Sequence, residues 1–151
     1  MRYPALSTNS APASEKDYGE VIALLEAASL PTEDLERSSM AHFLLAHDGS
    51  GNVIGAIGVE HYGRDALLRS LVVAPEYRNR KLGTQLVADL EARCRSLVVA
   101  NLFLLTTSAR NFFSSQGYQA IGRESIPAKL LAAAEFTRLC PGSATCMTKS
   151  L

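Results

Sequence analysis

Residues 71–87 read Leu-Val-Val-Ala-Pro-Glu-Tyr-Arg-Asn-Arg-Lys-Leu-Gly-Thr-Gln-Leu-Val. Before Pro75 the residues are apolar at both parities, which predicts a strand over 66–74 that is covered on both faces. A basic turn at 77–81 follows. Apolar residues then recur at helical spacing, which predicts an amphipathic helix over 82–96. The stretch therefore predicts a strand, a charged turn and a helix in direct succession.

The basic turn predicts an anion site. The first amides of a helix have no partner within it and lie at the positive end of its dipole. Arg78, Arg80 and Lys81 add positive charge at the same place, so phosphate or pyrophosphate is the suitable ligand. The turn has neither the P-loop pattern nor the three glycines of a dinucleotide fold. A solvated run of surface charges is the alternative interpretation.

Strand and helix patterns alternate along the rest of the chain. Ser14 begins a capping-box pattern with Asp17, apolar residues repeat at helical spacing from Tyr18 onward, and 48–52 is typical of a hairpin turn. The further expected elements are strands at 3–8, 42–46, 53–60, 97–106, 118–123 and 143–149, with helices at 18–30, after Thr32, at 108–116 (Ser108 as cap, Gly117 as stop) and at 127–139 (Pro127 first). This order predicts one α/β (α+β) domain over residues 1–151, with a mixed central sheet flanked by helices.

The composition is that of a soluble globular protein, since 47% of the 151 residues are hydrophobic and 20% are charged. The net charge is zero, but residues 1–76 carry −6 and residues 77–151 carry +6. A nucleic-acid-binding domain is usually basic overall, so this distribution favours a small polyanion instead. No apolar run reaches the roughly 20 residues of a membrane span, and the N-terminus lacks a signal-peptide core. We therefore expect a cytoplasmic protein that binds neither nucleic acid nor membrane.

Residues 71–87 resemble the acetyl-CoA-binding motif of the GNAT superfamily of N-acetyltransferases, where a strand and Val-x-Pro-x-Tyr-Arg lead into Arg/Gln-x-x-Gly-x-Gly/Ala and a helix. Residues 109–118, Ala-Arg-Asn-Phe-Phe-Ser-Ser-Gln-Gly-Tyr, resemble the family's next helix, Ala-x-x-Phe-Tyr-x-x-x-Gly-Phe. Residues 102–107 and 139–147 are similar to small acetyltransferases of bacterial arsenic-resistance operons. The resemblance implies a GNAT-like acyl-CoA N-acyltransferase fold with acetyl-CoA as cosubstrate.

The resemblance also implies direct acetyl transfer to the amine of a small molecule, linked to arsenic resistance, within a ternary complex. Main-chain groups of Leu71, Val72 and Val73 would pair with the pantetheine amides, and an N–H near Val73 would stabilise the oxyanion. This strand would splay from the strand at 101–106, and Thr106 takes the place of a cofactor-binding asparagine. The pyrophosphate would lie on the six loop positions, which here are Arg78, Asn79, Arg80, Lys81, Leu82 and Gly83.

Two residues depart from the family pattern. Lys81 replaces the first loop glycine, so either the backbone keeps a right-handed form that lysine accepts or the phosphate contacts change. Phe113 replaces the tyrosine that many family members use as general acid toward the CoA thiolate, and phenylalanine has no proton to give. Phe112, Phe113 and Tyr118 fit core aromatics, and Tyr118 is an alternative acid.

Glu60, at the end of a strand beside the central one, is the leading candidate for the catalytic base. The alternative is a solvated carboxylate at a strand end. His61 is the next candidate, on the opposite side of the strand. Arg69 lies in an apolar strand and needs a partner, so it either pairs with Glu60 or binds an anionic group of the substrate.

The cysteines and the fold leave other function classes open. Cys94 lies on the apolar face of its helix and fits the core, whereas Cys140 and Cys146 admit either a metalloid site or two buried thiols. No spacing predicts a resident metal. A non-catalytic module that binds CoA or an anionic metabolite is the second hypothesis, and a metalloid-binding accessory protein is the third. An exposed edge strand would allow a homodimer.

Overall fold

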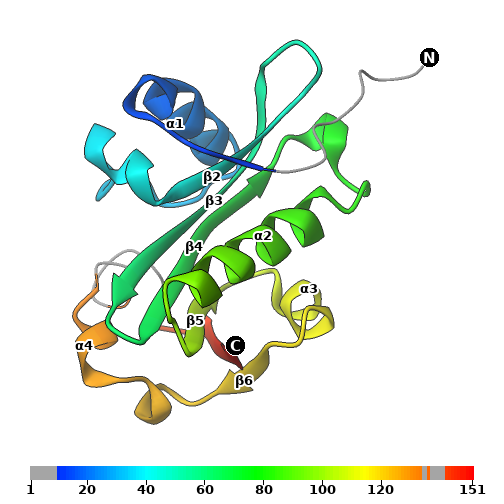
Figure 1. Cartoon of the computed structure of the whole chain (residues 1–151). Helices are drawn as coiled ribbons and strands as arrows, with labels where there is room; N and C mark the ends of the chain where they lie inside the picture. Colours follow the sequence, from blue (N-terminus) through cyan, green and yellow to red (C-terminus); the bar gives the residue numbers. More distant parts are fainter. Residues whose placement is uncertain (1–9, 134–135, 137–141) are drawn as a thin grey trace. The chain divides into compact units, whose positions relative to one another are not determined.

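The computed structural model describes residues 10–133, 136 and 142–151. In this part of the chain, seven strands form one hydrogen-bonded sheet in the order β1-β2-β3-β4-β5-β7-β6 (Figure 1). The strands are β1 Ala11–Pro12, β2 Phe43–His47, β3 Val53–Tyr62, β4 Asp65–Val73, β5 Asn101–Thr106, β6 Gln119–Ile121 and β7 Thr145–Ser150. The helices are α1 Tyr18–Ala27, α2 Leu82–Ser96, α3 Arg110–Ser115 and α4 Ala128–Leu131, with 3₁₀ turns η1 Glu15–Asp17, η2 Arg37–His42, η3 Pro75–Tyr77 and η4 Arg123–Ser125.

The sheet is mixed. Strand β4 pairs with β5 in parallel, joining Asp65–Leu67 to Asn101–Phe103, whereas β2 pairs antiparallel with β3 and β7 pairs antiparallel with both β5 and β6. A mixed sheet with flanking helices confirms the expected α/β architecture. The hairpin predicted around 48–52 is also confirmed, because β2 and β3 are antiparallel neighbours.

The chain forms two compact units. Unit 1 comprises the residues up to Gly58 together with Ser70–Leu90, and unit 2 comprises Val59–Arg69 and Glu91–Leu151. Strands β3 and β4 and helix α2 pass from one unit into the other, so neither unit is a continuous segment of the chain.

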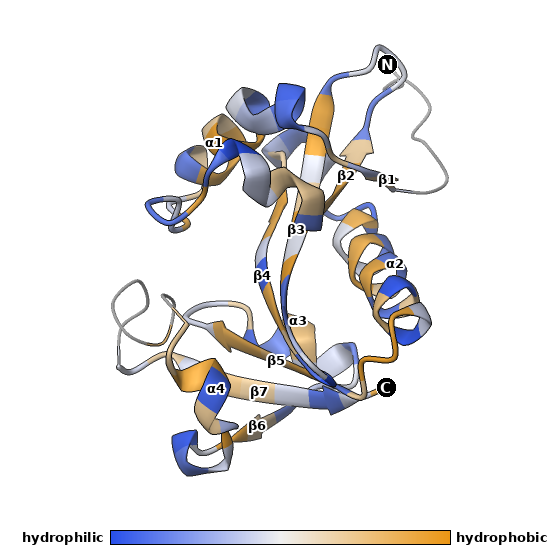
Figure 2. Cartoon of the chain, turned by 60° about the vertical axis from the view of Figure 1, so that its left-hand side comes forward, coloured by the Kyte–Doolittle hydropathy of each residue, from blue (hydrophilic) through white to orange (hydrophobic). Residues whose placement is uncertain are grey.

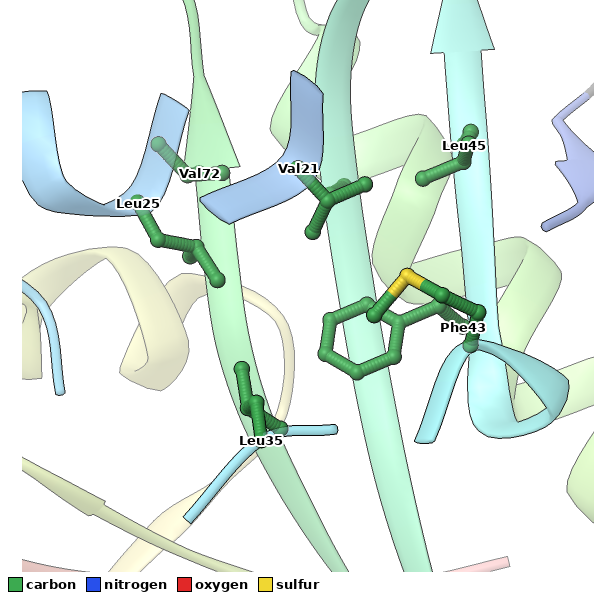
Figure 3. Packing of buried hydrophobic residues seen from close by; sticks show 8 residues of the cluster. Val21, Leu25, Leu35, Phe43, Leu45 and Val72 are labelled. Carbon is green, nitrogen blue, oxygen red and sulfur yellow. The ribbon is translucent and has the colours of Figure 1, made fainter. Parts of the chain in front are cut away.

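In unit 1, helix α1 buries its apolar side on the strands. Val21 and Leu25 lie one helical turn apart and pack with Phe43 and Leu45 of β2 and with Val72 of β4 (Figure 3). Phe43 and Leu45 are two residues apart and therefore face the same side of the sheet. The apolar spacing that predicted this helix thus also supplies its contact with the sheet.

The first half of α2 lies on the opposite face of the unit 1 strands (Figure 2). Its contact with β3 is made at a glycine, since a Cβ at Gly55 would stand 3.0 Å from Leu86 Cδ1 and 3.3 Å from the Val72 carbonyl oxygen. A larger residue at Gly55 would therefore push α2 away from the strand.

In unit 2, a buried carboxylate connects α2, the segment that follows α3, and β7. Glu91 of α2 accepts hydrogen bonds from Tyr118 Oη at 2.9 Å and from Lys149 Nζ at 3.0 Å. Lys149 Nζ also donates to the Gln116 carbonyl at 2.8 Å. A buried charge that loses its partner is strongly destabilising, so these contacts fix the three segments together. The apolar part of this unit is formed by Leu67, Phe103, Ile126, Leu130, Ala133 and Cys146.

Three helices end with a residue in the left-handed region: Ser29 (φ 60°) after α1, Val98 (φ 64°) after α2 and Gly117 (φ 94°) after α3. After α2, the Val98 amide donates to the Arg95 carbonyl at 3.1 Å and the next amide donates to the Cys94 carbonyl at 2.9 Å. This pair of bonds defines a Schellman motif. Gly117 confirms the predicted stop, whereas a β-branched valine in this conformation is unusual.

The N-terminal part of the chain differs from expectation in two places. The strand expected at 3–8 lies outside the described residues. The helix expected after Thr32 is instead the 3₁₀ turn η2, which begins later, where Glu36 N donates to Ser39 Oγ at 3.0 Å. The capping box at Ser14 is confirmed, and its Asp17 carboxylate accepts from the Ser14 amide at 2.9 Å.

The C-terminal part differs in the helices. Of the helix expected over 127–139, the residues described up to 133 form the four-residue α4, and Pro127 precedes α4 with an extended backbone at ψ 139°. Residues 134–135 and 137–141 lie outside the described residues. Ser108 is not the cap of α3, because Ala109 takes that position and donates its amide to Thr106 Oγ1 at 2.9 Å. Each helix of the described chain is too short or too polar to span a bilayer.

Candidate functional site

Strand β4 changes its backbone form within the segment expected to bind pantetheine. Ser70 has a φ of 58°, inside a strand that is otherwise extended. After this residue the burial alternates, with Val72 buried in the unit 1 core and Leu71 and Val73 partly exposed. The main-chain groups of Leu71 and Val73 therefore belong to a strand whose regular pleat is interrupted directly before them.

The basic turn is anchored to the end of β4. Tyr77, in the 3₁₀ turn η3, is buried, and the Arg80 guanidinium lies over its ring at 5.4 Å from the centroid. Arg78 Nε donates to the Val73 carbonyl oxygen at 3.2 Å. Two of the three basic side chains thus have defined contacts, which hold the turn against the strand that precedes it.

The backbone of the turn is left-handed at two positions, Asn79 (φ 65°) and Lys81 (φ 61°). The right-handed alternative for Lys81 is therefore wrong. Gln85 N donates to the Lys81 carbonyl at 3.0 Å, so Lys81 is the N-cap residue directly before the first residue of α2, Leu82. The turn keeps the backbone form that a glycine adopts without strain, even though a lysine occupies it.

The polar side chains of the turn are exposed, whereas its leucine is buried. Arg78, Asn79, Arg80 and Lys81 are exposed, whereas Leu82 is buried and can offer a ligand only its main chain. Gly83 lies in the first turn of α2, where amides have no carbonyl partner within the helix. Three exposed cations precede the N-terminus of a 15-residue helix, an arrangement suited to a phosphate or pyrophosphate.

In unit 2, Arg69 and Glu60 form an ion pair with Nη1 and Oε2 2.8 Å apart. The Arg69 side chain is 2% exposed and the Glu60 side chain 29% exposed. Of the two roles left open for Arg69, pairing with Glu60 is confirmed. Glu60 lies within β3 rather than at its end, because the strand continues to Tyr62. His61 is exposed, and alternation along the strand turns it away from Glu60.

Tyr62 is a residue of this site that sequence reasoning missed. Its hydroxyl donates to Glu60 Oε1 at 2.7 Å, so each oxygen of the carboxylate has its own donor. The sequence could have indicated Tyr62, because residues 60 and 62 are two apart in a strand and therefore lie on the same side of it.

Neither of the two residues considered for the general acid, Phe113 and Tyr118, can supply a proton to the CoA thiolate. Phe113 is buried, with its ring 5.6 Å from that of Tyr118 in an edge arrangement. The Tyr118 hydroxyl donates to the buried Glu91 carboxylate. Burial and this neighbouring charge raise the pKa of Tyr118 far above its usual range. Tyr118 therefore serves the core of unit 2, as its aromatic character predicted.

The cysteines of the described chain are core residues. Cys94 is buried, which raises the pKa of its thiol to about 11. Cys146 is also buried and its thiol pKa is raised by burial. Cys140 lies outside the described residues. Within residues 10–133, 136 and 142–151, His, Cys, Asp and Glu side chains form no group of three that could hold a metal ion.

The expected site residues fall into two groups. Leu71–Val73 and the turn 78–83 belong to unit 1, whereas Glu60, Arg69 and Thr106 belong to unit 2. Thr106 Oγ1 accepts the Ala109 amide, which fixes the link between β5 and α3. That the two groups serve one reaction is a prediction.

The chain matches the sequence profile of the acetyltransferase (GNAT) domain over residues 39–120. It is 32% identical over 97 residues to an amino-acid acetyltransferase of Aeromonas salmonicida, a match that covers 63% of this chain and 22% of that protein. It is 37% identical over 84 residues to an uncharacterised N-acetyltransferase of Chlorobaculum tepidum, covering 55% of this chain and 54% of the relative. The chain thus spans about a fifth of the length of the first relative and about half of the length of the second.

Among solved structures, N-acetylglutamate synthase of Neisseria gonorrhoeae in complex with coenzyme A and N-acetyl-glutamate is similar in fold. The TM-score is 0.83 at 17% identity, and the match covers 100% of this chain and 36% of that one. The profile match includes β2 to β5, the basic turn, α2 and α3. Because it covers more than half of the sequence, the chain belongs to the GNAT family of acetyltransferases.

Proposed function

We propose that this chain is an N-acetyltransferase that moves an acetyl group directly from acetyl-CoA to the amine of a small molecule. The observation that carries the proposal is the turn 78–83. It places three exposed cations and left-handed backbone at Asn79 and Lys81 immediately before the N-terminus of α2. A pyrophosphate fits this combination of a helix N-terminus and positive charge.

The chain's own groups would divide the work as follows. The main chain of Leu71, Val72 and Val73 pairs with the pantetheine amides, Thr106 contacts the cofactor, and the turn holds the pyrophosphate. An N–H near Val73 donates to the acetyl oxygen as negative charge develops, a contact whose loss costs about 2.7–4 kcal/mol.

Glu60 accepts the proton that the amine must lose. The amine nitrogen bonds to the acetyl carbon, the carbon–sulfur bond breaks, and the thiolate leaves. Glu60 suits this role because part of its side chain is exposed while its oxygens are held by Tyr62 and Arg69. A positioned base of this kind contributes about 10²- to 10⁴-fold to the rate.

For the acceptor we infer an amino-acid-like amine. Relatives of this chain carry the name amino-acid acetyltransferase. From the resemblance of residues 102–107 and 139–147 to acetyltransferases of arsenic-resistance operons, we further propose an amine-bearing arsenical as one such acceptor. We also infer that the protein acts in the cytoplasm and that residues 1–151 work as one acetyltransferase domain.

Calorimetric titration with acetyl-CoA, using ATP and NAD as controls, tests the cofactor site. We expect selective binding of acetyl-CoA, and loss of that binding in Gly83→Asp, because a carboxylate would occupy the first turn of α2. Release of free thiol in the presence of amino acids and amine-bearing arsenicals then tests transfer. No binding at millimolar acetyl-CoA would refute the proposal.

A second candidate function is a non-catalytic module that binds CoA or an anionic metabolite. It is favoured by Phe113, which is buried and has no proton to give, and by the use of the Tyr118 hydroxyl in the core. This candidate predicts binding of acetyl-CoA in the same titration but no thiol release with any acceptor.

A further inference from the structure

We propose that Tyr62 and Arg69 are positioning residues that hold the Glu60 carboxylate in one orientation for the acceptor amine, an inference that rests on the proposed function. Tyr62 Oη donates to Glu60 Oε1 at 2.7 Å, and Arg69 Nη1 donates to Oε2 at 2.8 Å. The terminal torsion of a free glutamate is broad. Separate donors on the two oxygens restrict that torsion and fix the plane of the carboxylate.

All three side chains come from one hairpin of unit 2. Glu60 and Tyr62 lie on the same side of β3, because they are two residues apart. Gly63, with a φ of 72°, begins the turn into β4, which carries Arg69. The Tyr62 ring packs against the apolar cluster that contains Leu67, so its hydroxyl is presented to Glu60 from an anchored ring.

Exposure assigns different roles to the two charged groups. The Arg69 side chain is 2% exposed, whereas 29% of the Glu60 side chain is exposed. An acceptor that reaches this cluster therefore meets the carboxylate, with the guanidinium behind it. Each carboxylate oxygen has two lone-pair directions, so Glu60 can accept an amine proton while both donors stay bound. Arg69 thus acts through Glu60.

A double-mutant cycle with Tyr62→Phe and Glu60→Gln tests the proposal. Tyr62→Phe keeps the packed ring and removes the hydroxyl that donates to Glu60. We expect it to lower kcat about tenfold, with the KM for acetyl-CoA unchanged. In the Glu60→Gln background, where no carboxylate remains to be oriented, the same change should have no further effect. Tyr18→Phe is the matched control, because the Tyr18 hydroxyl donates to the Leu35 carbonyl in unit 1.

Arg69→Lys provides a second, independent cycle that does not require Glu60→Gln to fold. Lysine keeps a positive charge at the buried position but lacks the planar guanidinium. We expect a lower kcat with unchanged affinity for acetyl-CoA by calorimetry. Combined with Tyr62→Phe, the loss should be smaller than the product of the two single losses, because both changes release the same carboxylate.

The outcomes separate this inference from the proposed function. Tyr62→Phe that loses the same factor with and without Glu60, or loses nothing, overturns the positioning role while the enzyme remains active. Losses that multiply in the Arg69→Lys cycle also overturn it. A wild-type chain that binds acetyl-CoA but acetylates no amine refutes the proposed function, and the inference with it.

Discussion

Replacing Lys81 by glycine separates the cost of the turn's backbone from the benefit of its charge. Lys81 has a φ of 61°. A left-handed residue with a side chain is strained by about 1–2 kcal/mol, which Lys81→Gly relieves. About 0.5–1 kcal/mol of this gain in the free energy of unfolding is lost, because glycine makes the unfolded chain more flexible. Removing a cation from the positive end of the helix dipole raises the free energy of unfolding by a further amount of about 0.3–1 kcal/mol. We expect a net gain of about 1 kcal/mol, which raises Tm by about 2–4 °C.

Binding of acetyl-CoA should change in the opposite direction. Lys81 is exposed, and a solvent-exposed ion pair contributes about 0.2–1 kcal/mol, so its loss weakens the affinity up to about fivefold. Lys81→Ala is the matched control because it removes the same charge but keeps the Cβ. It should lose the same affinity and gain less stability than Lys81→Gly. Thermal unfolding followed by circular dichroism and calorimetric titration measure the two effects separately.

Two results would refute this reasoning. Equal rises in Tm for Lys81→Gly and Lys81→Ala would show that the left-handed backbone stores no strain at this position. Unchanged affinity in both variants would show that the ammonium does not contact the cofactor.

Further predictions concern the helix end and the buried groups. Val98→Gly should raise the free energy of unfolding by about 1 kcal/mol, because the Schellman position of α2 favours glycine, and Val98→Ala should gain less in urea denaturation. Lys149→Met should lower it by about 3–5 kcal/mol, since the buried Glu91 would keep only the exposed Arg95, 3.9 Å away, as a cationic partner. Lys129→Met should change it little, because the Lys129 side chain is half exposed and lies 3.9 Å from Asp65. Burial raises the pKa of Cys94 from 9.0 to about 11, so the unfolded chain ionises first. The contribution of the Cys94 thiol to the free energy of unfolding is therefore complete below pH 9 and is lost between pH 9 and 11. Cys94→Ala should reduce this decline in stability with rising pH.

Much of the fold follows from local patterns. Residues 66–96 carry a strand signal, a proline stop and a helical repeat, and the structure has the corresponding β4, η3 and α2. Gly117 ends α3 as predicted, because only glycine adopts the left-handed form there freely. The pairing of Arg69 with Glu60 could be anticipated as one of two alternatives, because a buried cation requires a partner.

Other features lack a local signal. Left-handed backbone at Ser70, Lys81 and Val98 contradicts the preference of each residue, and the surrounding structure imposes it. The contact of Glu91 with Lys149 joins residues that are far apart in sequence, so no pattern in either segment predicts it. The end of α4 at Leu131 also cannot be read from the apolar composition of this segment.

The interleaving of the two units has a consequence for synthesis on the ribosome. Val72 completes the apolar surface beneath α1, but it emerges only after residues 59–69, which belong to unit 2. A nascent chain that stops before β4 therefore carries α1 and β2 with part of their shared surface uncovered. Such chains should associate with chaperones or aggregate, because exposed apolar surface and unpaired strand edges promote both. Unit 1 can therefore fold completely only after the ribosome has synthesised its second segment, Ser70–Leu90.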